Sequence, residues 1–135
     1  MQTFLPYSDY AKSAEVLDNR RLGKQRVECL QLLKALHDPS YGWKHHPATK
    51  MWRGHETSLV EYGVAVCLEW RRRGFKDTCL GKIAVYGVRG NSPKPDWLTF
   101  EFCRSHQSNL IQKDPPFYGP KFPGVPKGLP YVWPV

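Results

Sequence analysis

The segment of the sequence best suited to chemistry is residues 17–36, which read LDNRRLGKQRVECLQLLKAL. Its apolar residues recur at helical spacing and predict one buried helix face, formed by Leu22, Cys29, Leu30, Leu33 and Leu36. Two turns of the same segment carry four cations, namely Arg20, Arg21, Lys24 and Arg26. At about 100° per residue, one side of this helix presents Arg21, Lys24, Gln25 and Glu28. A single carboxylate therefore lies within a cationic surface.

The overall charge indicates what such a surface binds. The 135 residues carry 20 Lys and Arg against 12 Asp and Glu, for a net charge of +8. This excess favours a polyanionic partner, and for a compact basic domain nucleic acid is a commoner partner than an anionic membrane. A protein that is merely kept soluble by its charge is the alternative. No apolar run of about 18 residues occurs, and MQTFLPYSDY does not resemble a signal peptide, so we expect a cytoplasmic, nucleoid-associated protein.

A second region with nucleic-acid character is YGWKHHPATKMWRGHE, residues 41–56, in which aromatic residues alternate with cations. Cations bind phosphates, and aromatic faces stack on bases that have left the double helix. The DNA contacts expected from this region are His46, Lys50, Trp52 and Arg53. Each tryptophan taken alone could instead be a core residue. The run Arg71, Arg72 and Arg73 either complements the negative end of a helix dipole or contacts DNA.

Metal and cofactor chemistry has little support in the sequence. The cysteines, Cys29, Cys67, Cys79 and Cys103, form no CxxC pair, and we expect them to be reduced. A zinc site built from Cys103, His106, His45 and His46 is disfavoured, because structural zinc sites use two close ligand pairs at a short separation. The sequence also lacks a glycine-rich phosphate loop, a GxSxG motif and an HExxH motif. We expect neither a metal nor a cofactor.

The elements that position these residues are predicted to be helices. Helices are expected near residues 7–18 (capped by Ser8 or Asp9), 19–37 (capped by Asn19), 47–53, 55–75 and 96–113, the last with Trp97, Phe100 and Cys103 inward. Residues 76–88 fit either a helix or a short strand. From Asp114 onward, seven prolines predict that the preceding helix does not continue and that the segment is irregular, and five aromatic residues are expected to hold it to the body. The fold expected for residues 1–135 is a compact, single-domain, monomeric, all-α bundle with an irregular C-terminal segment.

Four segments together resemble the pyrimidine dimer DNA glycosylases of the phage endonuclease V type and, more closely, their bacterial relatives. They are MQTFLP at the start, RRLGKQRVE at 20–28, HPATKMWRGHETSLVEYGVAVCLEWRRRGFKDT at 46–78 and PPFYGPKF at 115–122. The second of them is similar to an Arg–x–Leu–x–Arg stretch at the active site of that family. The resemblance covers nearly the whole chain, although each motif is short.

This resemblance implies an all-α DNA repair enzyme that flips a nucleotide out of double-stranded DNA. It would be an N-glycosylase with abasic-site lyase activity on damaged or modified pyrimidines. In that family the N-terminal amine attacks the sugar C1′ and forms a Schiff base, a glutamate assists, and β-elimination nicks the strand. The amine here would belong to Met1. Arg21 occupies the position of the family's glutamate, so the expected substitute is Glu28, with Asp18 and Glu15 as alternatives.

Other roles follow from the same comparison. Lys24 is a rival nucleophile, because neighbouring cations favour a neutral amine. Arg20, Arg21, Lys24 and Arg26 would bind phosphates, with Arg21 and Lys24 nearest the chemistry. Tyr118 and Lys121 would form a third contact surface. The main alternative is a non-catalytic DNA- or RNA-binding protein on the same scaffold. A more distant one is a metal-dependent nuclease that uses His45, His46 and acidic ligands.

Overall fold

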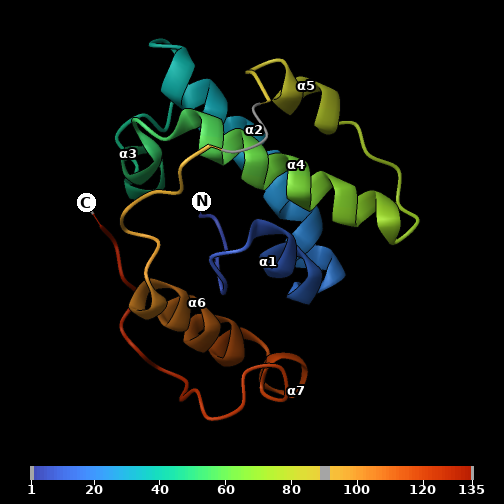
Figure 1. Cartoon of the computed structure of the whole chain (residues 1–135), viewed down its shortest axis with the longest axis vertical. Helices are drawn as coiled ribbons and strands as arrows, with labels where there is room; N and C mark the ends of the chain where they lie inside the picture. The colour runs from blue at the N-terminus through green and yellow to red at the C-terminus, as the bar shows by residue number, and fades with distance from the viewer. Residues whose placement is uncertain (1, 89–91, 135) are drawn as a thin grey trace.

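The computed structural model describes residues 2–88 and 92–134 and confirms the all-α prediction. Within these residues the chain forms no strand and the following helices: α1 Tyr10–Val16, α2 Asn19–His37, α3 Pro47–Trp52, α4 Glu56–Arg72, α5 Leu80–Ala84, α6 Phe100–Lys113 and α7 Pro115–Tyr118 (Figure 1). The segment that suited either a helix or a strand contains the short helix α5. No helix of the described residues has the length and apolarity needed to cross a membrane.

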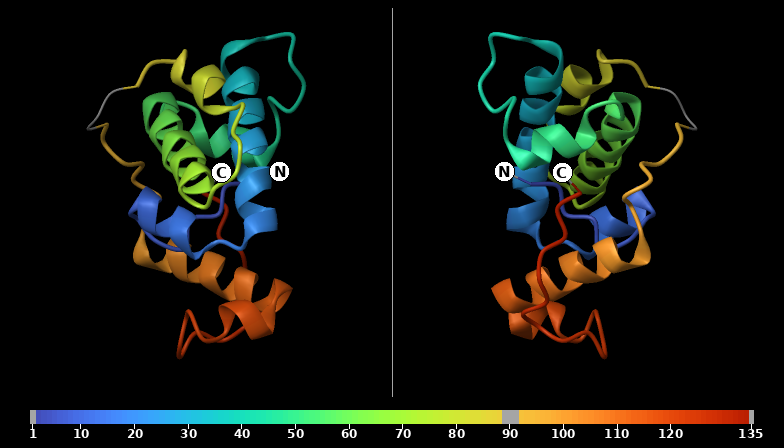
Figure 2. Two further views of the ribbon diagram at one scale, coloured as in Figure 1. Left: turned by 90° about the vertical axis from the view of Figure 1, so that its right-hand side faces the viewer. Right: turned by 90° about the vertical axis from the view of Figure 1, so that its left-hand side faces the viewer.

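The helices surround the first residues of the chain. Helices α2 and α4 pack side by side, α1 packs on α4, and α5 packs against both α2 and α4. Helix α6 lies on the other side of the N-terminal segment, with α7 at its end (Figures 1 and 2). The C-terminal segment returns to the N-terminal segment, where the Tyr131 hydroxyl donates to Gln2 Oε1 (Figure 2). This arrangement brings the start of the chain against α2.

Helix boundaries follow local hydrogen bonding. Asp9, one of the two expected caps, begins α1 by accepting a hydrogen bond from the Lys12 amide. Helix α2 is capped by Asp18 and not by the expected Asn19, because the Asp18 carboxylate accepts from the Arg21 amide at 3.2 Å. Asn19 is the first helical residue instead.

One expectation about the C-terminal third was wrong. Phe100 was expected to point inward but is 80% exposed, because the Thr99 cap sets the start of α6 and places Phe102 on the buried face. The proline-rich segment does not continue α6, as expected, but it begins with the short helix α7. Pro115 is tolerated in the first turn, where its missing N–H needs no partner, and Asp114 caps the helix. After α7 the chain is irregular and is held to the body by the buried Phe122 ring and the partly buried Tyr131 ring.

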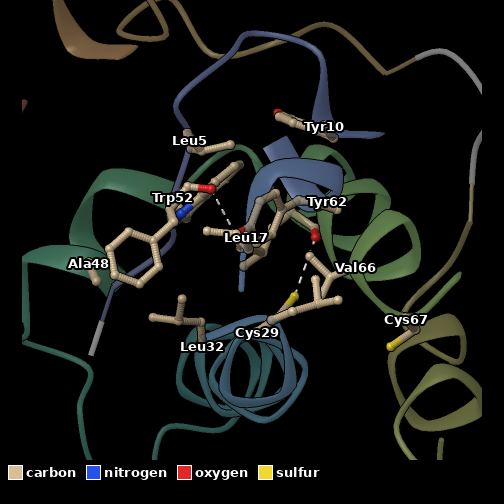
Figure 3. Close-up of a cluster of buried hydrophobic side chains, with 14 of the residues drawn as sticks. Leu5, Tyr10, Leu17, Cys29, Leu32, Ala48, Trp52, Tyr62, Val66 and Cys67 are labelled. Atoms are coloured by element: carbon tan, nitrogen blue, oxygen red, sulfur yellow. Dashed lines mark hydrogen bonds between the residues drawn. The ribbon is translucent and has the colours of Figure 1, made fainter. Parts of the chain in front are cut away.

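The core is built around Trp52 and Tyr62, which are both fully buried (Figure 3). Their rings lie 6.4 Å apart between centroids, and the Leu32 and Cys29 side chains of α2 lie nearby. The four cysteines are free and buried, so the expectation that Cys29 and Cys67 are core residues is confirmed. One side of α2 packs against this core, and another side of α2 carries the polar residues.

Candidate active site

The N-terminal segment is buried and fixed by side chains from three helices. The Phe4 amide donates to Gln25 Oε1 of α2 at 2.9 Å. The Leu5 amide donates to His106 Nδ1 of α6 at 3.0 Å. The indole of Trp52, in α3, donates to the Thr3 hydroxyl at 3.1 Å. The position of the first residues is therefore set by the whole fold and not by local sequence.

Glu28 lies beside the start of the chain. Its Oε2 atom accepts hydrogen bonds from the Gln2 amide at 3.3 Å and from Gln25 Nε2 at 3.1 Å. Within the described residues its carboxylate forms no ion pair, although Lys24 lies one turn earlier on α2. Met1 itself lies outside the described residues. The Gln2 nitrogen that Glu28 contacts is the atom covalently bonded to Met1.

A polar pocket of about 250 Å³ opens at this point. It is lined by Gln2, Phe4, Arg20, Arg21, Lys24, Gln25, Glu28 and Lys113. Three of its cations come from the first turns of α2, as the helical periodicity predicted, and the fourth comes from the last turn of α6. Sequence reasoning missed Gln2 and Lys113, because no local pattern links them to α2. The pocket combines four cations with one carboxylate and can bind an anionic ligand.

A second hollow of about 430 Å³ lies beside the first and shares Arg20, Lys24 and Glu28 with it. The remaining lining is largely apolar and includes Val27, which is 45% exposed, and Trp70. Gly23 permits this arrangement, since a β-carbon there would lie 3.0 Å from the Trp70 ring. A charged pocket and an apolar hollow thus meet along one edge of α2.

Tyr118 is fully buried, which contradicts the expectation that it contacts DNA. Its hydroxyl donates to the Asp18 carboxylate and accepts from the Asp18 amide. Asp18 in turn pairs with Arg21 at 3.2 Å. Partial burial alone would raise the pKa of Asp18, but the hydrogen bonds from Tyr118 and Arg21 outweigh it and lower that pKa below its usual value. Tyr118 therefore orients Asp18, which holds Arg21 at the pocket.

Arg26 was expected to bind phosphate, and the structure contradicts this role. Its guanidinium donates to the buried Asp77 carboxylate at 2.6 Å and lies 4.5 Å from the centre of the Trp70 ring. The Asp77 carboxylate also accepts hydrogen bonds from the Cys79 and Leu80 amides at the start of α5. Arg26 is thus committed to joining α2 to α5, because breaking the pair would leave a buried carboxylate without its counter-charge.

The second surface predicted from residues 41–56 is only partly formed. Trp52 is in the core, which contradicts its expected contact with DNA, whereas Lys50 and Arg53 are exposed. His46 is half-buried and caps α3 by accepting from the Ala48 amide at 3.0 Å; partial burial lowers its pKa. Lys121 is exposed beside the Phe117 ring.

Trp43 is an exposed aromatic of this surface that the predicted contacts omitted. It is 54% exposed and has φ of 71°, a conformation that bulky residues rarely adopt. Its ring lies edge-on to His46, which also contacts Trp133 from the C-terminal segment. The signal that could have found it is its place within an aromatic and basic loop.

The described residues contain no group of three or more His, Cys, Asp or Glu side chains that could hold a metal ion. His45 and His46 are neighbours in sequence, but no acidic ligand joins them there to complete such a group. The geometry therefore gives no support to the metal-dependent nuclease that the sequence left open.

His106 anchors the N-terminal segment in the neutral state. It is 1% exposed, lies between the rings of Phe102 and Tyr131, and accepts from Leu5 through Nδ1. Burial lowers its pKa to about 3. The unfolded chain has a histidine pKa of about 6.5. Between these values the unfolded state binds a proton that the folded state excludes, so falling pH favours unfolding.

We therefore expect the free energy of unfolding to fall by about 1.4 kcal/mol for each pH unit between roughly pH 6 and pH 5. Urea unfolding at a series of pH values measures this slope. His106→Gln keeps an acceptor for Leu5 and removes the titration, so its slope should be much flatter. His45→Gln, at an exposed histidine, serves as the control and should keep the slope. Equal slopes in all three proteins would contradict the assignment to His106.

Comparison with known proteins bears on this site. A family model described as pyrimidine dimer DNA glycosylase matches residues 1–82, which is 82 of the 135 residues. The matched range contains the N-terminal segment and all of α2, including Glu28. It ends before Lys113 and the C-terminal segment. No curated protein and no solved structure matches the chain.

Proposed function

Because the chain belongs to the pyrimidine dimer DNA glycosylase family, we propose that it excises a damaged or modified pyrimidine from double-stranded DNA and then nicks the abasic site. The observation that carries this proposal is the Glu28 carboxylate, 3.3 Å from the Gln2 amide inside a cationic pocket. An amine at the start of the chain, an acid and phosphate-binding cations are the groups that the chemistry requires.

In the proposed reaction, the neutral amine of Met1 attacks C1′ of the damaged nucleotide. The bond from C1′ to the base breaks, and the base leaves with the electron pair and takes up a proton. After the amine loses its proton and the sugar ring opens, C1′ and the amine nitrogen form an iminium ion. Cations around a terminal amine favour its neutral form, and the Glu28 carboxylate stabilises the positive charge as it develops.

Strand cleavage follows from the same intermediate. Glu28 accepts the proton from C2′, and the electron pair forms a C1′–C2′ enamine. The enamine electrons then form a C2′–C3′ double bond and re-form the iminium, and the 3′ phosphate leaves with the electron pair of the C3′–O bond. Water then hydrolyses the Schiff base and releases the amine. The whole sequence consumes water only and requires neither a metal nor an oxidant.

The polar pocket and the apolar hollow bind different parts of the nucleotide. Arg20, Lys24 and Lys113 are exposed around the polar pocket and bind the phosphates on either side of the target. The adjoining apolar hollow, with Val27 and Trp70, receives a base that has left the helix. Its shared border with Glu28 keeps that base next to the reacting sugar.

The test uses duplexes that carry a thymine dimer, uracil or an abasic site, together with an undamaged duplex, with EDTA present. We expect base release from one of the damaged duplexes and nicking at the abasic site. Tight binding without either reaction would instead indicate the non-catalytic alternative, which Arg21 at the family's glutamate position favours. Activity that appears only when magnesium replaces EDTA would indicate a metal-dependent nuclease.

Phosphate binding has its own expected result. If about five cations contact phosphates, the logarithm of the binding constant should fall against the logarithm of salt concentration with a slope of about −4.5. Lys24→Ala should reduce the slope by about one. Lys82→Ala, at an exposed lysine of α5 that lines neither hollow, is the control and should leave the slope unchanged. A wild-type slope near zero, measured by fluorescence anisotropy, would contradict a phosphate-binding surface.

A further inference from the structure

Gln25 binds the backbone of the N-terminal segment as a neighbouring strand would. Its side chain is 1% exposed. Its Oε1 atom accepts from the Phe4 amide at 2.9 Å, and its Nε2 atom donates to the Gln2 carbonyl at 3.0 Å. These are the carbonyl of one residue and the amide two residues later, the pair that an adjacent β-strand would engage. One side chain of α2 thus fixes the extended start of the chain.

The same amide also binds Glu28 and Tyr62. Nε2 donates to Glu28 Oε2 at 3.1 Å, and Oε1 accepts from the Tyr62 hydroxyl at 2.5 Å. A glutamine side chain has two donor hydrogens and two acceptor lone pairs, and here all four are used. A flipped amide would place its NH₂ group against the Phe4 N–H and its oxygen against the Gln2 carbonyl. The hydrogen bonds therefore specify a single orientation.

Tyr62 fixes this orientation from the core. Its ring is fully buried, and burial raises its pKa well above the usual value, so the hydroxyl keeps its proton. That hydroxyl is directed at both Gln25 Oε1 and the Phe4 carbonyl. The chain of contacts runs from the core through Tyr62 and Gln25 to Glu28.

We propose that Gln25 is a positioning residue that holds the first residues of the chain and the Glu28 carboxylate in register with one another. This inference rests on the proposed function, because the register matters only if both groups act on one sugar. Glu28 has a flexible side chain and no ion pair among the described residues. Its two hydrogen-bond donors are Gln25 and the Gln2 amide, and Gln25 also holds Gln2. Loss of the Gln25 side chain would therefore remove a hydrogen bond from Gln2 and one from the Glu28 carboxylate at the same time.

The test compares Gln25→Met with a matched control, Gln107→Met. Gln107 also holds the N-terminal segment, by donating to the Pro6 carbonyl at 2.8 Å, but it does not contact Glu28. For Gln25→Met we expect borohydride trapping on abasic duplex to slow by roughly a hundredfold, because a displacement of about 1 Å costs that much, with DNA affinity within about twofold of wild type. Gln107→Met should lose stability and keep the trapping rate.

A second readout does not depend on DNA chemistry. The pH dependence of acylation of the N-terminal amine by a small reagent, followed by mass spectrometry, should have a shifted midpoint in Gln25→Met. The midpoint should move toward that of an unfolded peptide with the same first residues. This shift in a protein without lyase activity would support the positioning role and refute only the proposed function.

Unchanged trapping and an unchanged acylation midpoint in a folded Gln25→Met protein would overturn the inference. If that variant does not fold, Tyr62→Phe replaces it. That change removes the hydroxyl that fixes the orientation of the Gln25 amide, so the amide is free to turn away from Gln2 and Glu28. A reduced trapping rate at unchanged DNA affinity would support the role, and wild-type values in both assays would overturn it.

Discussion

Replacement of Glu28 by glutamine is expected to lower the single-turnover rate on an abasic or damaged duplex by roughly a hundredfold or more. The glutamine oxygen can still accept from the Gln2 and Gln25 amides, so the geometry of the site should persist. In the proposed mechanism, the change removes only the charge that stabilises the iminium ion and the base that takes the C2′ proton. DNA affinity should hold or rise, because a negative charge leaves a phosphate-binding pocket.

The competing explanation is that Glu28 only pairs with Lys24 one turn earlier, which would contribute about 0.3–0.5 kcal/mol on an exposed helix. No such pair forms among the described residues. Glu101→Gln, at an exposed carboxylate of α6 that lines neither hollow, is the control and should keep the wild-type rate. An unchanged rate in Glu28→Gln would remove Glu28 from the active site, and Asp18 would be tested next.

Acetylation of the N-terminal amine is expected to abolish strand cleavage at abasic sites. An acetylated nitrogen shares its lone pair with the carbonyl group and cannot attack C1′. The effect is measured by gel analysis of a preparation in which mass spectrometry verifies that the N-terminal amine is completely acetylated and that the lysines are not. Lys24→Ala should cleave more slowly because it loses a phosphate contact, but it should remain active. Normal cleavage by acetylated protein, with none by Lys24→Ala, would identify Lys24 as the nucleophile.

The parts of the site that lie on α2 were predictable because helical periodicity is local information. The spacing of Arg21, Lys24, Gln25 and Glu28 places them on one side of the helix, and the structure finds all four at one pocket. The approach of Gln2 to Glu28 was not predictable in the same way. An extended segment has no helical period, and its place depends on partners as distant as His106.

The errors share a physical cause, since residue type indicates a chemistry but not an environment. Arg26 resembles its cationic neighbours, but its counter-charge Asp77 lies 51 residues later. Trp52 and Tyr118 suit both stacking on bases and packing in a core, and tertiary contacts decided for the core in both cases. Phe100 and Phe102 are the same residue type but lie on different faces of α6, and the cap at Thr99 determines which of them faces the core.

The measurement that most directly tests the Schiff-base mechanism is borohydride reduction during incubation with a duplex that contains an abasic site. The trapped adduct is then digested with a protease, and the peptide joined to DNA is identified by mass spectrometry. We predict that this peptide begins with Met1 and that the DNA is attached to its terminal nitrogen. A peptide modified at Lys24 would contradict Met1 as the nucleophile. No adduct from a wild-type protein that binds the duplex would contradict the Schiff-base mechanism itself.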